Sequence, residues 1–217
     1  MPHTLTAINI SKTIKQKEVL SGINFELQGG KVYGFVGENG SGKTMLFRVL
    51  SGLVKPSTGQ VLYDGNTLGK GNTDVRLGVI IENSFLWPDL TAYENLCFLA
   101  GLKHYIGPQQ VREALQRVGL DDKNRLPIKN YSLGMKQRLI VAQAIMEQPD
   151  FLFLDEPTNS IDADGTKVIR KIIEQEAGRG AVVLLASHIS QDISELCEST
   201  FAMRWGHCTP YVRTDEA

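Results

Sequence analysis

The sequence predicts an α/β fold, in which a mixed sheet core is interrupted by a lobe of helices. Three observations predict it. The segment 37–44, GENGSGKT, lies between a strand candidate and a helix candidate. Two unbroken apolar runs, 151–154 and 181–186, are typical of parallel strands covered on both faces of a sheet. The stretch 91–146 has mostly helical periodicity.

The first third of the chain is predicted to be rich in strands. Residues 4–10 and 18–27 alternate apolar and polar side chains, as half-buried strands do. Gly29 and Gly30 turn the chain into the next strand, and a helix is expected over 45–50. The further strand candidates are 31–36, 60–63 and 75–81. The second of them enters a hairpin at Asp64-Gly65.

Helix signals dominate the middle of the chain. Thr91 and Glu94 form a capping box, Pro108 opens a second helix that ends at Gly119, and a third runs from Ser132 to Glu147. Helices at 162–176 and 189–198 and a β segment at 200–213 complete the chain. We therefore expect one domain over 1–217. Its core spans 1–83 and 146–217 and includes the antiparallel β part, and its helical lobe spans 84–145.

Composition limits the classes of function. The 217 residues carry a formal net charge of -1, so no overall basic field predicts a nucleic-acid partner. The three cysteines have no metal-like spacing, and Cys97 and Cys197, which have apolar neighbours, are expected to be reduced packing residues of a cytosolic protein. No apolar run approaches the roughly 20 residues needed to cross a bilayer, and no signal peptide is evident. Any membrane-spanning helices are expected on another chain.

The segment 37–44 matches the phosphate-binding pattern G-x-x-x-x-G-K-[ST]. Its glycines let backbone N–H groups converge on phosphate oxygens, and the following helix directs its positive dipole end at the same anion. Lys43 is expected to reach the β- and γ-phosphates, and Thr44 to bind Mg²⁺. A chance glycine-rich turn is disfavoured because strand, loop and helix follow in order. The predicted nucleotide contacts are Gly37, Glu38, Asn39, Gly40, Ser41, Gly42, Lys43, Thr44 and Met45.

Asp155 and Glu156 end the apolar run 151–154, at the strand end where open parallel sheets bind ligands. Asp155 is predicted to hold Mg²⁺ through water, and Glu156 to orient a water against the γ-phosphate. The alternative is that acids end this strand only because loops are polar. His188 follows the run 181–186 at the same sheet edge and could donate to the γ-phosphate, although a lone histidine is more often structural.

One further segment indicates a family. Residues 131–138, YSLGMKQR, resemble the signature motif of ABC ATPases. Ser132 can cap the third helix. Its hydroxyl and the first free N–H groups of that helix would form an anion site, which Gly134 would allow a ligand to approach closely. The alternative is an ordinary cap without a ligand. Three more segments resemble the family's Walker B motif, D-loop and switch histidine: 155–158 (DEPT), 159–162 (NSID) and 186–188 (ASH).

The chain thus resembles the ATP-binding subunit of an ABC transporter over its whole length. The resemblance implies a P-loop NTPase of ABC type, with a RecA-like mixed sheet core, an antiparallel β subdomain and an inserted helical subdomain. It implies ATP and Mg²⁺ as ligands and a head-to-tail dimer. ATP would lie between Lys43 of one copy and Ser132 and Gly134 of the other. The helical lobe would contact transmembrane permease subunits at the cytoplasmic face of the cell membrane.

The sequence departs from the family pattern at three places. The signature carries Leu133 and Met135 where Gly and Gln are usual. Glu82 takes the position of the Q-loop glutamine, where a carboxylate would bind Mg²⁺ more strongly than an amide; the alternative is a surface acid at a strand end. We expect Glu82→Gln to alter the Mg²⁺ dependence of hydrolysis or its coupling to transport, and an unchanged Mg²⁺ titration would reject this. Ile14 aligns with the aromatic residue that stacks on adenine, so weaker apolar contact and relaxed base selectivity are expected.

The segments IIE at 80–82 and 131–138 are similar to those in bacitracin-resistance and lantibiotic-immunity exporters. The favoured function is therefore an ATPase subunit that powers a bacterial exporter of antimicrobial peptides, lipids or drug-like substrates. Lys43, Glu156 and His188 would carry the catalysis, and Thr44, Glu82 and Asp155 would manage the metal. An alternative is a soluble ABC-type switch that acts on a non-transport assembly.

Overall fold

The computed structural model describes residues 2–68, 75–81 and 86–211. Its larger sheet has six strands in the order β5-β6-β7-β3-β8-β9. All neighbours pair in parallel except β8 and β9, which are antiparallel. The strands are β3 (Lys31–Val36), β5 (Leu77–Ile80), β6 (Phe151–Asp155), β7 (Val182–Ala186), β8 (Ser199–Arg204) and β9 (His207–Tyr211). The strands β6 and β7, predicted from their apolar runs, are buried except at Asp155.

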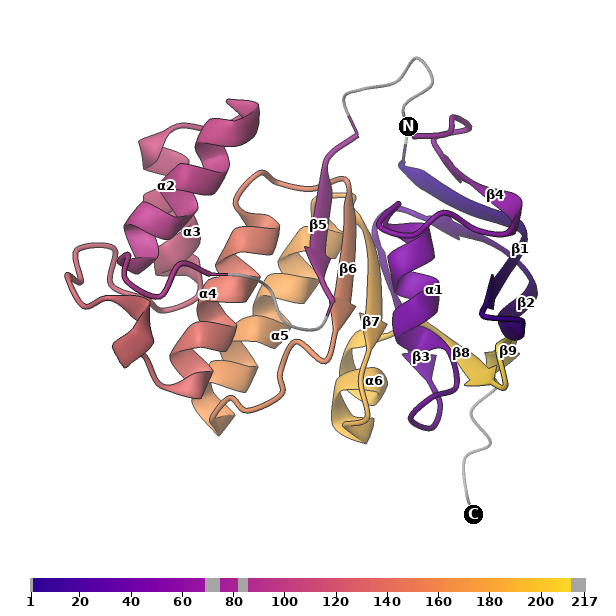
Figure 1. Ribbon diagram of the computed structural model, residues 1–217. Coiled ribbons are helices and arrows are strands. Elements are labelled where there is room, and N and C mark those ends of the chain that lie inside the picture. The colour runs from indigo at the N-terminus through magenta and orange to yellow at the C-terminus, as the bar shows by residue number, and fades with distance from the viewer. Residues whose placement is uncertain (1, 69–74, 82–85, 212–217) are drawn as a thin grey trace.

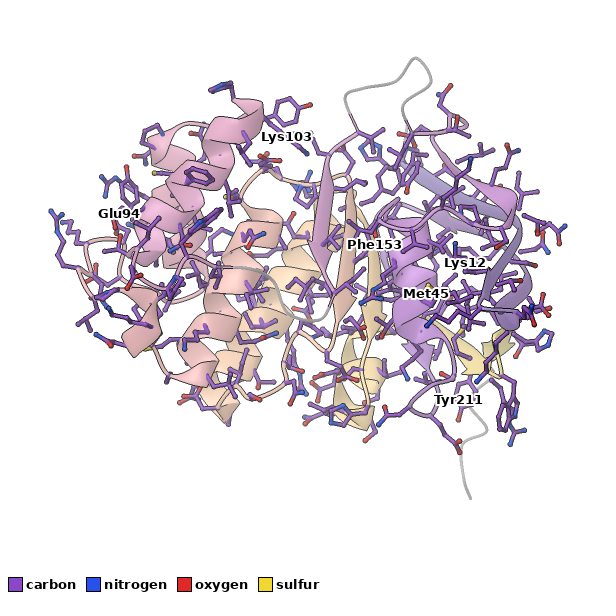
Figure 2. All side chains as sticks on the ribbon, viewed as in Figure 1. Lys12, Met45, Glu94, Lys103, Phe153 and Tyr211 are labelled. Carbon is purple, nitrogen blue, oxygen red and sulfur yellow. The ribbon has the colours of Figure 1, made fainter. Side chains whose placement is uncertain are left out.

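A second, antiparallel sheet has the order β2-β1-β4. Its strands are β1 (Thr4–Ile14), β2 (Lys17–Gln28) and β4 (Thr58–Tyr63). The helix α1 (Lys43–Leu50) lies between this sheet and the central strands (Figure 1). Apolar side chains from all three share one core, in which the ring of Phe47 on α1 contacts those of Phe35 and Phe153. Phe153 lies between β6 and α1 in Figure 2.

Within the described residues, the fold is completed by a 3-10 helix at Ile128–Asn130 and by five further α-helices. They are α2 (Ala92–Lys103), α3 (Pro108–Arg117), α4 (Leu133–Ile145), α5 (Ala163–Gly178) and α6 (Ser190–Leu196). The helices α2 and α3 lie at the end of the molecule farthest from the antiparallel sheet (Figure 1). The predicted starts are confirmed: Thr91 and Ser132 are N-caps, and Pro108 opens α3. Within the described residues, no helix combines the length and apolarity needed to span a bilayer.

Some predicted bounds were wrong by a few residues. The helix α1 begins at Lys43, inside the phosphate loop, rather than at Met45. The helix α4 ends at Ile145. The closing β segment consists of two strands, because Trp205 and Gly206 take positive φ angles and turn the chain between β8 and β9. Each error lies at an element end, where local turn geometry decides the boundary.

Candidate nucleotide-binding site

The phosphate loop connects β3 to α1 and depends on glycine. Gly42 is the N-cap of α1 with a φ of 109°, a conformation that other residues rarely adopt. A Cβ at Gly37 would clash with the backbone carbonyl of Met203 on β8. Lys43 Nζ donates to the carbonyl oxygens of Gly37 and Glu38, at 2.7 and 3.1 Å. The ammonium group therefore lies over the loop, where the sequence predicts the phosphates.

Thr44 and Asp155 meet although 111 positions separate them in the chain. The Thr44 hydroxyl donates to Asp155 Oδ2 at 2.6 Å, which joins the first turn of α1 to the end of β6. A hydroxyl and a carboxylate are hard oxygen donors of the kind that Mg²⁺ prefers. The pair therefore fits the predicted metal, with both donors beside the phosphate loop.

Glu156 and His188 form a second contact at the same sheet edge. Glu156 has a φ of 53°, and its backbone N–H donates to Ala186 O at 2.9 Å. The backbone N–H of His188 donates to Glu156 Oε1 at 3.1 Å, and the ring Nδ1 lies 2.7 Å from Oε2. The ends of β6 and β7 thus hold the predicted catalytic carboxylate and the predicted switch histidine together.

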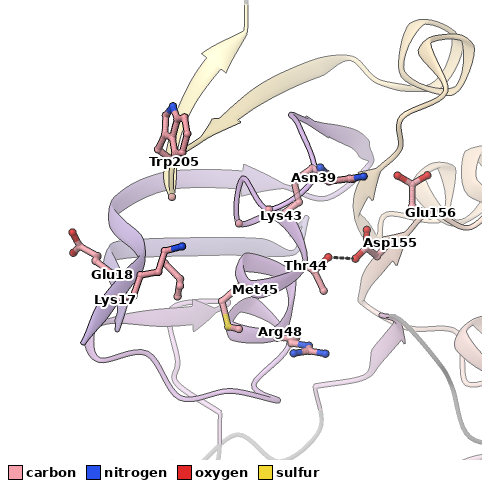
Figure 3. Close-up of a pocket in the computed structure, with 14 residues that line it drawn as sticks. Lys17, Glu18, Asn39, Lys43, Thr44, Met45, Arg48, Asp155, Glu156 and Trp205 are labelled. Carbon is pink, nitrogen blue, oxygen red and sulfur yellow. Dashed lines mark hydrogen bonds between the residues drawn. The ribbon is translucent and has the colours of Figure 1, made fainter. Parts of the chain in front are cut away.

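A cavity of about 730 Å³ lies beside the phosphate loop. Thr44, Asp155 and Glu156 line it together with Lys43 and Met45 (Figure 3). Lining residues that the sequence did not reveal are Lys17, Glu18, Val19, Arg48, Trp205 and Gly206. Trp205 is the most informative of them, because its side chain is 84% exposed, so most of the ring is accessible to a ligand. No motif marks it, and only the turn between β8 and β9 brings it to the cavity.

Several of the predicted nucleotide contacts in the phosphate loop do not line the cavity of about 730 Å³. Gly37, Glu38 and Ser41 line a smaller cavity of about 360 Å³, while Asn39 and Gly40 line both cavities. Among the described residues, the buried Ser41 hydroxyl has no hydrogen-bond partner.

The cavities do not test the roles predicted for two residues that depart from the family pattern, Ile14 and Glu82. Ile14 pairs with Lys17 at the β1–β2 turn but is not among the residues that line either cavity. Glu82 lies outside the described residues. The roles predicted for both stay predictions.

Ser132 and Gly134 lie at a third cavity, of about 550 Å³. The Ser132 hydroxyl accepts from Met135 N at 3.2 Å, as an N-cap of α4 should. A Cβ at Gly134 would lie 3.3 Å from Ser160 O, so the signature turn packs against the segment predicted as the D-loop. This cavity shares no lining residue with the one beside Lys43. Within one chain, the two predicted halves of the ATP site are therefore separate.

A phosphate loop between β3 and α1, two acids at the end of a parallel strand and a helical lobe in which Ser132 caps α4 form the arrangement of an ATP-binding cassette. The comparison with protein families agrees: residues 20–159 match the model described as ABC transporter. The chain belongs to the ABC transporter family as an ATP-binding subunit.

Curated relatives extend over most of the chain. The uncharacterized ABC transporter ATP-binding protein YybJ of Bacillus subtilis is 42% identical over 203 residues, which cover 93% of each chain. The lantibiotic transport ATP-binding protein SrtF of Streptococcus pyogenes is 34% identical, over 88% of this chain and 82% of its own. The bacitracin transport ATP-binding protein BcrA of Enterococcus faecalis is 34% identical, over 100% of this chain and 71% of its own. The predicted resemblance to this subgroup is confirmed.

Solved structures share the fold. The dimeric structure of MJ0796, described as a bacterial ABC transporter cassette, aligns with a TM-score of 0.84 over 94% of this chain and 96% of its own, at 22% identity. A structure of the ATP-binding subunit of an ABC transporter aligns with a TM-score of 0.86 over 97% of this chain and 90% of its own. The predicted fold class is thus confirmed, while the bounds 84–145 of the helical subdomain stay a prediction.

Proposed function

We propose that this chain hydrolyses ATP to power a bacterial exporter of antimicrobial peptides or other amphiphiles. The observation that carries the proposal is the pair of contacts at one sheet edge, Thr44 with Asp155 and Glu156 with His188, beside the phosphate loop. A module that only binds ATP would not need a carboxylate and a histidine held together beside the phosphate loop. The relatives named for bacitracin and lantibiotic transport support the class of cargo.

The proposed chemistry divides among the residues by position. Lys43 would turn from the carbonyl oxygens of its own loop to the β- and γ-phosphates. Glu156 would accept a hydrogen bond from the attacking water and align it with the γ-phosphorus. His188 would leave Glu156 and donate to the γ-phosphate or to the released phosphate. Mg²⁺ held near Thr44 and Asp155 would supply positive charge that neutralises the phosphate oxygens.

We further propose that the complete site needs two copies of the cassette. Ser132 and Gly134 line a cavity separate from that of Lys43, so neither cavity of one chain contains both the phosphate loop and the signature residues. A head-to-tail pair would close the N-terminus of α4 of one copy over the γ-phosphate held by the other. Loss of that phosphate would then weaken the association, which makes the dimer a switch.

The proposed membrane partner is a permease on a separate chain, at the cytoplasmic face of the membrane. The helix α2 at the free end of the helical lobe exposes Phe98 and Leu102, with side chains 52% and 67% exposed. The ring of Trp87 lies 4.5 Å from that of Phe98. An exposed apolar surface on the lobe supports contact with a permease rather than with nucleic acid.

The test is phosphate release by the chain co-purified with its permease from membranes. Wild type is expected to hydrolyse ATP in the presence of Mg²⁺. Glu156→Gln should lower kcat by at least about 100-fold and retain ATP binding, because it replaces the basic carboxylate that would polarise the attacking water with a neutral, much less basic amide. Equal turnover by wild type and Glu156→Gln would contradict the proposed mechanism. Purification without any membrane protein would contradict the proposed role in transport.

A further inference from the structure

Asp192 on α6 is completely buried, with 0% of its surface exposed, and its carboxylate accepts hydrogen bonds from three side chains. Arg170 on α5 donates to Oδ1 through Nε at 2.8 Å and Nη2 at 2.6 Å. Oδ2 accepts from the hydroxyl of Thr158 at 2.6 Å and from that of Ser187 at 3.1 Å. A buried carboxylate is stable only with such partners.

The two hydroxyl donors belong to the two segments that carry the proposed catalytic groups. Thr158 follows Glu156 by two positions, and Ser187 directly precedes His188. The Ser187 hydroxyl also accepts from the backbone N–H of Ile189 at 3.1 Å, so it is bonded on both sides. A single carboxylate oxygen thus holds the segment after β6 and the segment after β7 in one arrangement.

We infer that Asp192 is a positioning residue, which sets the distance between Glu156 and His188 by binding Thr158 and Ser187. The inference rests on the proposed ATPase function, because it assigns Asp192 to the geometry of that site. Asp192 does not line the cavity beside the phosphate loop, so it acts only through its two neighbours.

The two carboxylate oxygens of Asp192 have different partners, so their contributions to positioning the site and to stabilising the fold can be separated. Oδ1 takes both bonds from Arg170, which also donates to Glu195 at 2.7 Å, and this part of the network joins α5 to α6. Oδ2 takes only the two loop hydroxyls. Loss of the Oδ2 bonds should therefore disturb the site, while loss of the Arg170–Glu195 bond should not.

The test compares four variants in the complex with the permease. Asp192→Asn keeps the shape of the side chain but replaces one carboxylate oxygen with an amide N–H₂. That group would face either the guanidinium of Arg170 or the hydroxyls of Thr158 and Ser187. Thr158→Val and Ser187→Ala each remove one bond to Oδ2 and leave the Arg170–Asp192 pair intact. Glu195→Gln is the matched control, because it weakens the exposed partner of the same arginine.

Misplaced reacting groups lower rates steeply, so we expect kcat of Asp192→Asn to fall by about 10- to 100-fold, with ATP affinity changed by less than about 2-fold.

Hydrogen exchange gives a second readout that does not depend on turnover. Asp192→Asn should speed exchange of the amides of Glu156 and His188, whose N–H groups donate to Ala186 O and to the Glu156 carboxylate. Exchange in α1 should be unchanged, and Glu195→Gln should resemble wild type in every measurement.

Three outcomes would overturn the inference. One is unchanged exchange at both amides in Asp192→Asn. Another is unchanged kcat in both hydroxyl variants of a chain whose wild type is active. The third is a parallel fall in kcat, ATP affinity and thermal stability, which would indicate a purely structural role. An inactive wild type would instead contradict the proposed function, and the exchange data would still decide the role of Asp192.

Discussion

The Lys43 side chain is held by the backbone of its own loop. Its ammonium group donates to two carbonyl oxygens of the phosphate loop, so it lies beside the space where the phosphates are proposed to bind and would have to exchange these acceptors for phosphate oxygens. The cost of exchanging carbonyl oxygens for phosphate oxygens is small, because the new acceptors are charged and the bonds to them are stronger.

Replacing Lys43 with alanine is predicted to remove those charge-assisted bonds. A hydrogen bond between charged groups contributes about 1.5–3 kcal/mol, so the Kd for ATP should rise by roughly 10- to 100-fold. The thermal midpoint should change little, because the side chain bonds only to its own loop. Calorimetric titration with ATP checks the prediction, and an affinity equal to that of wild type would contradict it.

Trp205 is predicted to contact the base end of ATP. The phosphates would fix one end of the nucleotide at Lys43, and Lys17, Glu18 and Trp205 line the same cavity. Stacking of an aromatic side chain on a base contributes about 1–3 kcal/mol, which would compensate for the aliphatic Ile14. The chain has two tryptophans, so Trp87→Phe leaves Trp205 as the single reporter.

In that background, ATP should change the emission of Trp205 and inorganic triphosphate should change it much less. Trp205→Ala should weaken binding of ATP by about 5- to 100-fold without affecting binding of triphosphate, since only ATP carries a base. Equal responses to the two ligands would show that the ring senses the phosphate loop rather than the base.

The sequence predicted where site residues lie when they belong to a contiguous motif, and it did not predict residues whose place depends on the tertiary structure; the chemical roles of both groups stay predictions. The phosphate loop and the pair Asp155-Glu156 were predicted, and the structure places them at one cavity. Trp205 and Asp192 could not be predicted, because only the tertiary structure brings Trp205 to the cavity and joins Asp192 to Thr158, which lies 34 positions earlier in the chain. Asp192 in the segment ISQDISE has the pattern of a solvated acid on a short helix, and only the fold shows that it is buried.

Among the elements, α2 has the most complete local start signal. The Thr91 hydroxyl accepts from Glu94 N, and the Glu94 carboxylate accepts from Thr91 N. The sequence alone predicted this capping box, because all of its groups lie within four residues. By contrast, the ends of α1 and α4 depend on the phosphate loop and on packing, and their predicted bounds were less accurate.

The capping box predicts how stability depends on pH. The hydrogen bond from the Thr91 backbone, followed by that from its hydroxyl, lowers the pKa of Glu94 below its ordinary value of 4.5. A carboxyl group with a lowered pKa stabilises the folded chain above its unfolded pKa, and this stabilisation is lost as the pH falls through the folded pKa. Glu94→Gln should therefore melt below wild type at neutral pH.

The difference in melting temperature between wild type and Glu94→Gln should disappear in acid, once Glu94 is protonated in both states. Glu113→Gln on α3 is a suitable control, because the Glu113 carboxylate accepts a hydrogen bond from the side chain of Gln109 on the same helix and does not take part in a capping box. A deficit of Glu94→Gln that persists at the lowest pH would mean that packing, rather than charge, causes it.

At the scale of the whole molecule, the separation of the two cavities predicts that two inactive variants can complement each other. Lys43→Ala should inactivate the phosphate-loop half of the site, and Ser132→Arg should block the signature half. Each variant alone would form only defective sites in the proposed head-to-tail pair. A mixed pair would contain one site with both halves defective and one with both halves intact, because each site takes one half from each copy.

Mixing the two variants in equal amounts should therefore restore hydrolysis, to roughly a quarter of the wild-type rate if pairing is random and the sites are independent. Lys43→Ala mixed with Glu156→Gln should stay inactive, because both changes damage the same half of the site. This control distinguishes complementation from simple stabilisation by a partner. Failure of the first mixture, with mixed pairs demonstrated by two different affinity tags, would mean that each chain completes its own site.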